Sequence, residues 1–168
     1  YLSRTITHKL YEAHEETRIS QEIVLGIGGA KVLEEANIEP EIYHLNEGHA
    51  IPVAFHLYSK LGSTEEVRKR MVFTTHTPET AGNEEHDFSL LHRMGFFNGL
   101  SHESVKEITQ IDGNRFSLTV GALRLSKIAN GVSKLHGDVA NKMWESYPNI
   151  CPIISITNAQ NKKFWVDK

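Results

Sequence analysis

Phe73-Thr74-Thr75-His76-Thr77-Pro78 is the stretch that decides the fold, because an apolar run there ends in a polar turn. Three further runs end in the same way, at His44-Leu45-Asn46-Glu47-Gly48-His49, Ala129-Asn130-Gly131-Val132-Ser133 and Ser155-Ile156-Thr157-Asn158. A parallel α/β sheet binds ligands at the carboxyl ends of its strands. Four polar junctions at such ends therefore predict one cleft, with side chains that suit a polyhydroxylated substrate.

Strand and helix patterns alternate around these junctions. Strands are expected at 42–45, 71–75, 126–130 and 153–157, and helices at 18–36, 50–61, 87–94, 101–109, 116–124 and 132–144. Ser63, with Glu66 three residues later, predicts a further helix start. The polar, turn-rich segment 78–87 predicts a surface loop close to the cleft. The class is therefore α/β, with a largely parallel sheet and flanking helices.

Composition and charge narrow the class of protein. The 168 residues suffice for one domain with its own core, and the formal net charge of -3 gives no sign of a nucleic-acid surface. No apolar run approaches the roughly 20 residues needed to cross a bilayer. The single cysteine, Cys151, excludes an internal disulfide framework and suits a reducing cytoplasm. Because the sequence starts at Tyr1 and stops at Lys168, soon after a tryptophan, we expect a piece of a longer protein.

Several familiar catalytic patterns are missing from the sequence. Gly26-x-Gly28-Gly29 lies in a helical pattern and lacks the third glycine of a dinucleotide fingerprint, so close packing or a kink explains it better. The histidines lack the spacing of a zinc helix, and no metal site is expected. No P-loop, Gly-x-Ser-x-Gly or Cys-x-x-Cys occurs. A polar cleft without a nucleophile or metal looks like half an active site, whose cofactor half would lie on another domain.

His76 is the first candidate for substrate binding. Pro78 disfavours a helical backbone at Thr77 and holds the junction extended. A neutral imidazole donates from one ring nitrogen and accepts at the other, which suits a sugar hydroxyl. The alternative is a histidine whose ring is hydrogen-bonded to neighbouring backbone carbonyls.

Other polar residues complete the predicted site. Glu47 could act as a general acid or a hydroxyl acceptor, and a solvated loop carboxylate is the alternative. Asn130 and Asn158 supply amide groups, which bind diols and carry no proton chemistry. We expect no catalytic residue in this chain and five substrate-binding residues, namely His76, Asn158, His49, Glu47 and Asn46.

At these residues the chain resembles the α-glucan (glycogen, starch or maltodextrin) phosphorylases, particularly the shorter bacterial and archaeal form. The matching segments are 10–18, 21–29, 44–50, 73–78, 81–83, 130–137, 143–144 and 156–158. They span nearly the whole chain. Several segments in the correct order make the likeness more specific than one short motif would.

The resemblance implies a GT-B glycosyltransferase fold, in which two Rossmann-like domains face each other across a cleft. Residues 1–168 would be a single-domain fragment, the later part of the N-terminal domain, without the C-terminal cofactor domain. The implied reaction is phosphorolysis, in which orthophosphate attacks a terminal α-1,4-glucosyl bond of a glucan and releases glucose 1-phosphate. Family members hold pyridoxal phosphate on a lysine of the C-terminal domain, so no lysine here is assigned to it. The parent would be a cytoplasmic homo-oligomer.

The family also suggests roles for particular residues. The histidine of its Thr-His-Thr segment contacts the glucosyl unit and maps to His76, and the asparagine of its Thr-Asn-Gly segment maps to Asn158. The segment that matches 46–49 lies close to the same sugar. Ala159 stands where the family has glycine, and a left-handed backbone there would be strained. The segment 161–165 departs from the family's Thr-Pro-Arg-Arg-Trp but keeps the tryptophan.

We therefore expect the sugar-facing wall of an α-glucan phosphorylase, inactive when isolated. One rival is a nucleotide-sugar glycosyltransferase similar to glycogen synthase, which would share the fold. The other is a non-catalytic carbohydrate-binding module, which would bind maltooligosaccharides without a partner domain.

Overall fold

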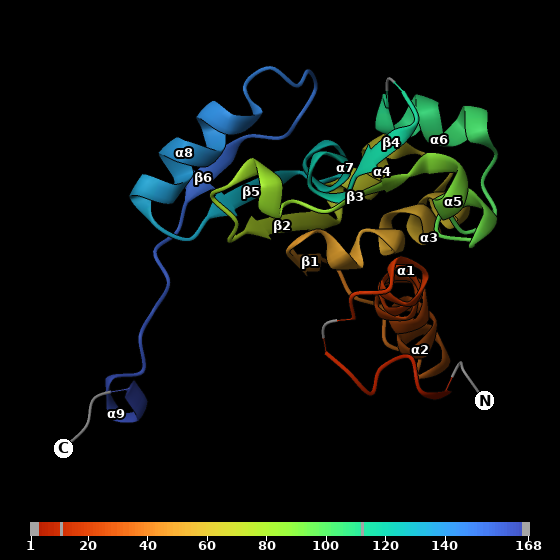
Figure 1. Cartoon of the computed structure of the whole chain (residues 1–168), viewed down its shortest axis with the longest axis horizontal. Helices are drawn as coiled ribbons and strands as arrows, with labels where there is room; N and C mark the ends of the chain where they lie inside the picture. Colours follow the sequence, from red (N-terminus) through yellow and green to blue (C-terminus); the bar gives the residue numbers. More distant parts are fainter. Residues whose placement is uncertain (1–3, 11, 112, 166–168) are drawn as a thin grey trace.

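The computed structural model describes residues 4–10, 12–111 and 113–165, and this part of the chain contains a four-stranded parallel sheet (Figure 1). Its strands are β1 (Tyr43–Asn46), β2 (Met71–Thr75), β5 (Ile128–Gly131) and β6 (Ile153–Ser155), in the order β1-β2-β5-β6. Each neighbouring pair is parallel. The predicted class and the four predicted strands are confirmed, with small differences at the strand ends.

Helices pack on one face of the sheet. α3 (Pro52–Leu61) and α4 (Thr64–Lys69) connect β1 to β2, α7 (Leu118–Leu125) precedes β5, and α8 (Lys134–Trp144) connects β5 to β6. α4 and α7 contact β2, and α8 contacts β5 and β6. Ser63 caps α4 by accepting a hydrogen bond from the backbone N–H of Glu66 at 3.3 Å, which confirms the predicted helix start. The strand residues beneath these helices, such as Met71 and Phe73, are fully buried.

The opposite face of the sheet is open in the described part of the chain. His44 and Asn46 of β1 are exposed, and Ile154 of β6 is 44% exposed. Side chains alternate between the faces of a strand, so these residues share the face away from Phe73. Parallel sheets are usually covered on both faces. An uncovered face of this kind is available for contacts with further protein.

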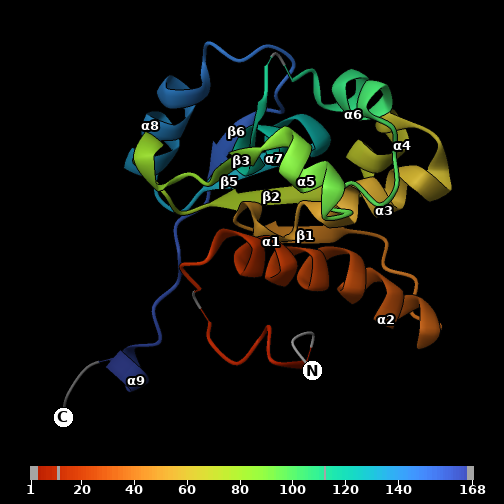
Figure 2. The same ribbon diagram turned by 45° about the vertical axis from the view of Figure 1, so that its right-hand side comes forward.

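One long helical segment lies beside β1 (Figure 2). It consists of α1 (Glu15–Ile23), a π-helical turn η2 (Val24–Gly28) and α2 (Gly29–Glu35), and it contacts α3 and the short 3-10 turn η3 (Gly48–Ala50). A Cβ atom at Gly26 would lie 2.8 Å from the backbone oxygen of Ala50 and 2.8 Å from the backbone nitrogen of Val53. The predicted helix is therefore confirmed, and close packing explains Gly26 but not Gly29, where nothing lies within 4 Å of a Cβ position.

Two predictions about the middle of the chain are wrong. The segment 78–87 is not only a surface loop, because it contains the 3-10 turn η4 (Thr80–Gly82) and strand β3 (Glu85–Asp87). β3 pairs antiparallel with β4 (Arg115–Ser117), where the sequence predicts the start of a helix. α7 begins only at Leu118, after Ser117 caps it. β3 and β4 contain no apolar run, unlike the equally short β6, and only their pairing reveals them.

The remaining helices agree with the sequence pattern. α5 (Phe88–Arg93) and α6 (His102–Thr109) follow β3, and α8 begins two residues later than expected because Ser133 is its N-cap. Phe55 of α3 packs edge-on against Phe97, with ring centroids 4.9 Å apart. Phe96 and Phe116 complete this buried aromatic cluster. The last helix, α9 (Lys162–Trp165), lies apart from the sheet (Figure 1). Within the described ranges, no helix is both long and apolar enough to span a membrane.

Candidate sugar-binding edge of the sheet

The four polar junctions lie along one edge of the parallel sheet. The register pairs Asn46 with Thr74, Thr74 with Asn130, and Asn130 with Ile154. Because all four strands run in the same direction, the residues that follow these positions leave the sheet at the same side. The structure thus has the arrangement that the predicted cleft needs. The role of the individual residues in substrate binding stays a prediction.

Glu47 joins the loops that follow β1 and β2. Its Oε1 accepts hydrogen bonds from the backbone N–H of His76 and from the hydroxyl of Thr77, the latter at 3.1 Å. Its own N–H donates to the carbonyl of Thr74 at 2.9 Å. Its backbone has φ 65° and ψ 174°, a conformation mostly reserved for glycine, which these bonds hold in place. Glu47 is therefore not a solvated loop carboxylate, and among the described residues its Oε2 has no hydrogen-bond partner.

His76 presents a free ring at this edge. The residue is exposed, and in the described part of the chain its imidazole makes no hydrogen bond or ion pair. The alternative reading, a ring bonded to neighbouring backbone carbonyls, is therefore not what the structure shows. Both ring nitrogens remain able to contact a ligand hydroxyl.

Asn158 lies next to the turn that follows β5. Its backbone N–H donates to the carbonyl of Val132 at 3.0 Å, which continues the β5–β6 pairing beyond the strand ends, and its side chain is exposed. Ala159 is not among the described residues that have a positive φ. The strain that the sequence comparison with the family suggested at this position is therefore absent.

A chain of side-chain hydrogen bonds crosses three strands on the open face. The hydroxyl of Thr74 donates to Oδ1 of Asn130 at 2.8 Å, and Nε2 of His44 lies 2.7 Å from the same hydroxyl. Since Thr74 has one hydroxyl proton and gives it to Asn130, His44 must donate from Nε2. The amide oxygen of Asn130 is thus engaged inside the protein, and its NH₂ group also donates to the carbonyl of Gly131 at 3.4 Å, which leaves one N–H for a ligand. Sequence reasoning did not find this series of hydrogen bonds, because it depends on how β1, β2 and β5 are aligned in the sheet.

A cavity of about 220 Å³ lies beside Glu47. His49 and Thr77 line it with Glu47, and so do Arg18 and Glu84. Asn46, His76 and Asn158 do not line it, and all three are exposed at the sheet edge. The cavity is smaller than the roughly 300–1,000 Å³ of typical ligand pockets. The described residues therefore form an open wall with a small recess and not a closed site.

Charged side chains cluster behind this recess. Arg18 donates from Nη2 to Oε1 of Glu84 at 2.7 Å, and its Nε lies 3.6 Å from Oε1 of the buried Glu22. His86 Nε2 lies 3.8 Å from a carboxylate oxygen of each glutamate. Burial raises the pKa of Glu22. Burial would also raise the pKa of Glu84, but the nearby imidazole of His86 and the hydrogen bonds from Arg18 outweigh burial, so this pKa lies well below its usual range.

This cluster contains potential metal ligands. One ligand atom each from Glu22, His49 and Glu84 lies within 4.8 Å of the others. The guanidinium of Arg18 lies among the same atoms, at 2.9 Å from His49 Nδ1, and supplies the positive charge that a metal ion would bring. We therefore assign no metal to these residues. Arg18, Glu22 and Glu84 were missed as site residues because helix α1, which carries the first two, lies far in sequence from Glu84.

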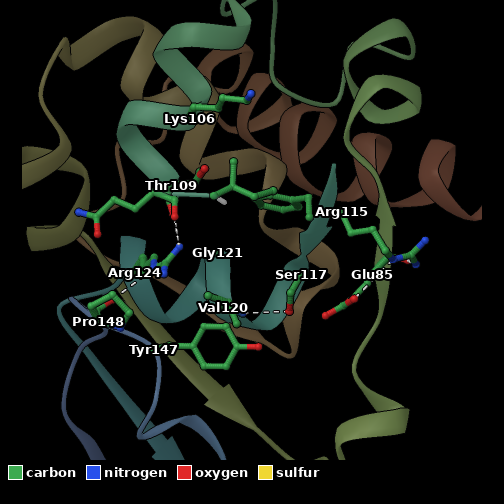
Figure 3. A pocket seen from close by; sticks show the side chains of 13 residues that line it. Glu85, Lys106, Thr109, Arg115, Ser117, Val120, Gly121, Arg124, Tyr147 and Pro148 are labelled. Carbon is green, nitrogen blue, oxygen red and sulfur yellow. Dashed lines mark hydrogen bonds and ion pairs between the residues drawn. The ribbon is translucent and has the colours of Figure 1, made fainter. Parts of the chain in front are cut away.

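A separate cavity of about 590 Å³ lies between α6, α7 and the loop that follows α8 (Figure 3). Lys106 and Tyr147 lie on opposite sides of it (Figure 3). Arg124 fixes its walls by donating to the carbonyls of Thr109, at 2.5 Å, and Pro148, at 3.3 Å. None of the predicted site residues lines this cavity.

The described lysines do not suit pyridoxal phosphate. A lysine that binds this cofactor covalently is held in a desolvated pocket. Every lysine whose side chain the structure describes is exposed. The residues present therefore do not fit the cofactor, and no step through it is assigned to this chain.

The parallel sheet and its flanking helices define the fold class as α/β, part of a Rossmann-like domain of the kind found in GT-B glycosyltransferases. The catalytic domain of starch synthase IV from Arabidopsis thaliana, solved with ADP and acarbose, aligns with a TM-score of 0.64 over 95% of this chain and 33% of that chain. Its sequence identity is 18%, so this likeness concerns the fold alone. No family model matches the sequence.

Sequence relatives include two named phosphorylases. The chain is 35% identical to maltodextrin phosphorylase from Thermococcus litoralis over 178 residues, 97% of this chain and 21% of the relative. It is 33% identical to glycogen phosphorylase from Mycobacterium tuberculosis, over 96% of this chain and 22% of the relative. An uncharacterized protein of Methanocaldococcus jannaschii is 47% identical over 98% of this chain and 31% of that protein. The chain is thus homologous to a segment of the α-glucan phosphorylases, and it spans about a fifth to a third of these relatives.

Proposed function

We propose that this chain forms the sugar-facing wall of the active-site cleft in an α-glucan phosphorylase. One observation carries the proposal. In a chain homologous to phosphorylases, the carboxyl edge of the sheet presents His76 and Glu47, which are joined because Oε1 of Glu47 accepts from the His76 backbone N–H. Among the described residues, the His76 ring and Oε2 of Glu47 have no hydrogen-bond partner. Such a wall binds and orients a glucosyl unit through hydrogen bonds to its hydroxyls.

Phosphorolysis explains why orientation matters. The bond from C1 of the terminal glucosyl unit to O4 of the next sugar breaks, a phosphate oxygen bonds to C1, and O4 takes up a proton. The glucosyl group passes through an oxocarbenium-like state, whose hydroxyls must stay in fixed positions. Holding reactants in place can lower a barrier by several kcal/mol, with about 7–11 kcal/mol as the upper range. No bond-making step is assigned to a residue of this chain.

The rest of the enzyme would supply what this wall lacks. The open sheet face, with His44 and Ile154 exposed, supports further protein packing there. The proposal includes an α-1,4-glucan and orthophosphate as substrates, glucose 1-phosphate as product, and a cytoplasmic homo-oligomer as parent. Pyridoxal phosphate would belong to the C-terminal domain. The proposal includes no nucleic-acid or membrane partner.

Two rival functions share part of this description. A nucleotide-sugar glycosyltransferase has the same fold, but the relatives at 33% and 35% identity are named phosphorylases. A stand-alone carbohydrate-binding module would bind maltooligosaccharides tightly through His76 with no other domain. An open wall should bind them weakly. Calorimetric measurement of maltooligosaccharide affinity for the chain therefore distinguishes a carbohydrate-binding module from a segment of a phosphorylase.

A chimera tests the proposed function directly. This chain replaces the matching segment of the Thermococcus litoralis maltodextrin phosphorylase, and glucose 1-phosphate release from maltodextrin is measured. We expect activity in the chimera and its loss in the His76→Ala version, while the isolated chain with pyridoxal phosphate releases none. A folded chimera without phosphorolysis, or release by the isolated chain, contradicts the proposal.

A further inference from the structure

Arg18 lies behind the predicted sugar-binding residues, at the centre of the charged cluster. We propose that Arg18 is a positioning residue of the cleft, which holds the turn carrying His49 and the loop carrying Glu84 against helix α1. The inference rests on the proposed function, since it concerns the same wall. It adds a residue that is not itself a predicted sugar contact and that acts through His49 and Glu84.

The contacts of Arg18 bring three distant segments together. Its Nε lies 3.2 and 3.1 Å from the two carboxylate oxygens of Glu84, and its Nη2 lies 2.7 Å from Oε1. The same Nη2 lies 2.9 Å from Nδ1 and 3.4 Å from Nε2 of His49. Hydrogen bonds between a guanidinium and a carboxylate are roughly twice as strong as neutral ones. One side chain of α1 therefore fixes partners 31 and 66 residues away in sequence.

Both partners are parts of the candidate wall. His49 lies two residues after Glu47 and lines the same 220 Å³ cavity. Glu84 ends the loop that begins at His76, and Glu47 holds the start of this loop through His76 and Thr77. The loop is thus fixed at its start by Glu47 and at its end by Arg18. If the end is released, the start can shift, and the His76 ring shifts with it.

The burial of Glu22 explains why the guanidinium of Arg18 pairs with the carboxylate of Glu84. Glu22 is 1% exposed, and among the described residues neither of its carboxylate oxygens has a hydrogen-bond partner. The groups around it are Arg18, His86, Glu84, His49 and, across a neighbouring cavity, Lys9. A buried carboxyl group without hydrogen bonds prefers its neutral form. With Glu22 neutral, the charge of Arg18 is committed to Glu84 and holds the loop.

The test measures geometry in the wall separately from stability. Backbone amide NMR spectra of the 168-residue chain are compared for wild type, Arg18→Met and Arg18→Lys, with Lys69→Met as control. Lys69 is an exposed cation that pairs with Glu65 and Glu66 far from the wall. Thermal unfolding confirms that each variant is folded at the measuring temperature. Arg18→Lys keeps the charge but not the planar fork, and so rescues only part of a positioning effect.

We expect Arg18→Met to move the amide resonances of Gly48, His49, His76 and Thr77 and to speed their hydrogen exchange about tenfold, the factor that a lost charged hydrogen bond implies. Lys69→Met should leave these amides unchanged. A folded Arg18→Met chain with wild-type resonances there, but lower stability, overturns the proposal and leaves a purely structural role. If Arg18→Met does not fold, Arg18→Lys and Glu84→Gln decide in the same way. Unfolding of both of these variants would also overturn it.

A sugar titration distinguishes a failure of the positioning role of Arg18 from a failure of the proposed function. Maltotriose is added to wild type and to Arg18→Met, and the shifts of the His76 amide are followed. Absence of any response in wild type counts against the proposed function, whereas the comparison without sugar still decides the positioning role. A wild-type response that Arg18→Met reduces severalfold supports both.

Discussion

The carboxylate of Glu47 accepts a hydrogen bond from the backbone N–H of His76, and this contact ties the ends of β1 and β2 together. It fixes the backbone of His76 while leaving its ring free. A binding residue benefits from this arrangement, because the main chain is held before the ligand arrives and less conformational entropy is lost on binding. Glu47 is therefore not an ordinary surface-loop residue, because its own backbone is held at φ 65° while its carboxylate contacts His76.

Replacing Glu47 tests this link. Glu47→Ala removes the acceptor, so amide hydrogen exchange at His76 should accelerate and the free energy of unfolding should fall by about 1–3 kcal/mol. Glu47→Gln keeps a side-chain oxygen at the same place and should retain most of the protection. Hydrogen exchange followed by NMR distinguishes the two variants. Equal protection of His76 in wild type and Glu47→Ala would show that the contact does not hold the loop.

Two glycines of the long helical segment should respond oppositely to alanine. At Gly26 a Cβ would lie 2.8 Å from two backbone atoms of the η3–α3 region, so Gly26→Ala should destabilise the chain by about 1–3 kcal/mol. At Gly29 nothing lies within 4 Å and φ is -58°, so Gly29→Ala should stabilise it by up to about 1 kcal/mol. Urea unfolding measures both. The same sign for both variants would contradict the packing described at Gly26.

Glu22 and Glu84 should make opposite contributions to stability. The pKa of Glu22 is raised by burial, so its contribution is present below its unfolded pKa and is lost as pH rises through the folded value. Hydrogen bonds overcome burial and lower the pKa of Glu84, so its contribution is present above the unfolded pKa and is lost as pH falls. At pH 7 Glu22→Gln should therefore raise the unfolding free energy, and Glu84→Gln should lower it, each by about 1–3 kcal/mol.

Unfolding curves at pH 5 and pH 7.5 check this pair of variants. The advantage of Glu22→Gln over wild type should be larger at pH 7.5, because a raised pKa makes the stability contribution of Glu22 decrease as pH rises. If Glu22→Gln is less stable than wild type at both values, the carboxyl group is ionised and paired, and the description of the cluster is wrong.

His86 should titrate above the ordinary histidine range. Burial alone would lower its pKa, but the nearby carboxylate of Glu84 and the hydrogen-bonded Glu15 outweigh burial and raise it. The stability from His86 is therefore fully present below its unfolded pKa and is lost as pH rises through the folded value. An NMR titration of the ring, with the urea-unfolded chain as reference, should show the higher midpoint, and Glu84→Gln should lower it. A folded midpoint at or below the unfolded one would refute the assignment.

Much of the fold could be predicted from the sequence because its signals are local. Apolar runs such as 71–75 and the cap at Ser63 depend only on neighbours in the chain, and both are where they were expected. β3 and β4 could not be predicted, because their residues form no apolar run and the strands are recognised only by their pairing. The order of the strands follows from the packing of the whole domain, and the sequence pattern left it open.

The candidate site divides in the same way. His76, Glu47 and Asn158 could be selected because polar residues directly follow strand patterns. Arg18 and Glu84 could not, because they come together from α1 and from a loop 66 residues later. The hydrogen bond from Thr74 to Asn130 likewise depends on the register of β2 against β5. Contacts of this kind require the tertiary structure.

The most direct measurement of the central claim is an amide NMR titration of the chain with maltotriose, in wild type and in His76→Ala. The account predicts weak binding, with shifts confined to His76, the Glu47–His49 turn and Asn158, and at least several-fold weaker binding in the variant. Tyr147, beside the separate 590 Å³ cavity, should not respond. Shifts centred on that cavity, or a response that His76→Ala leaves unchanged, would contradict the claim that this edge of the sheet faces the sugar.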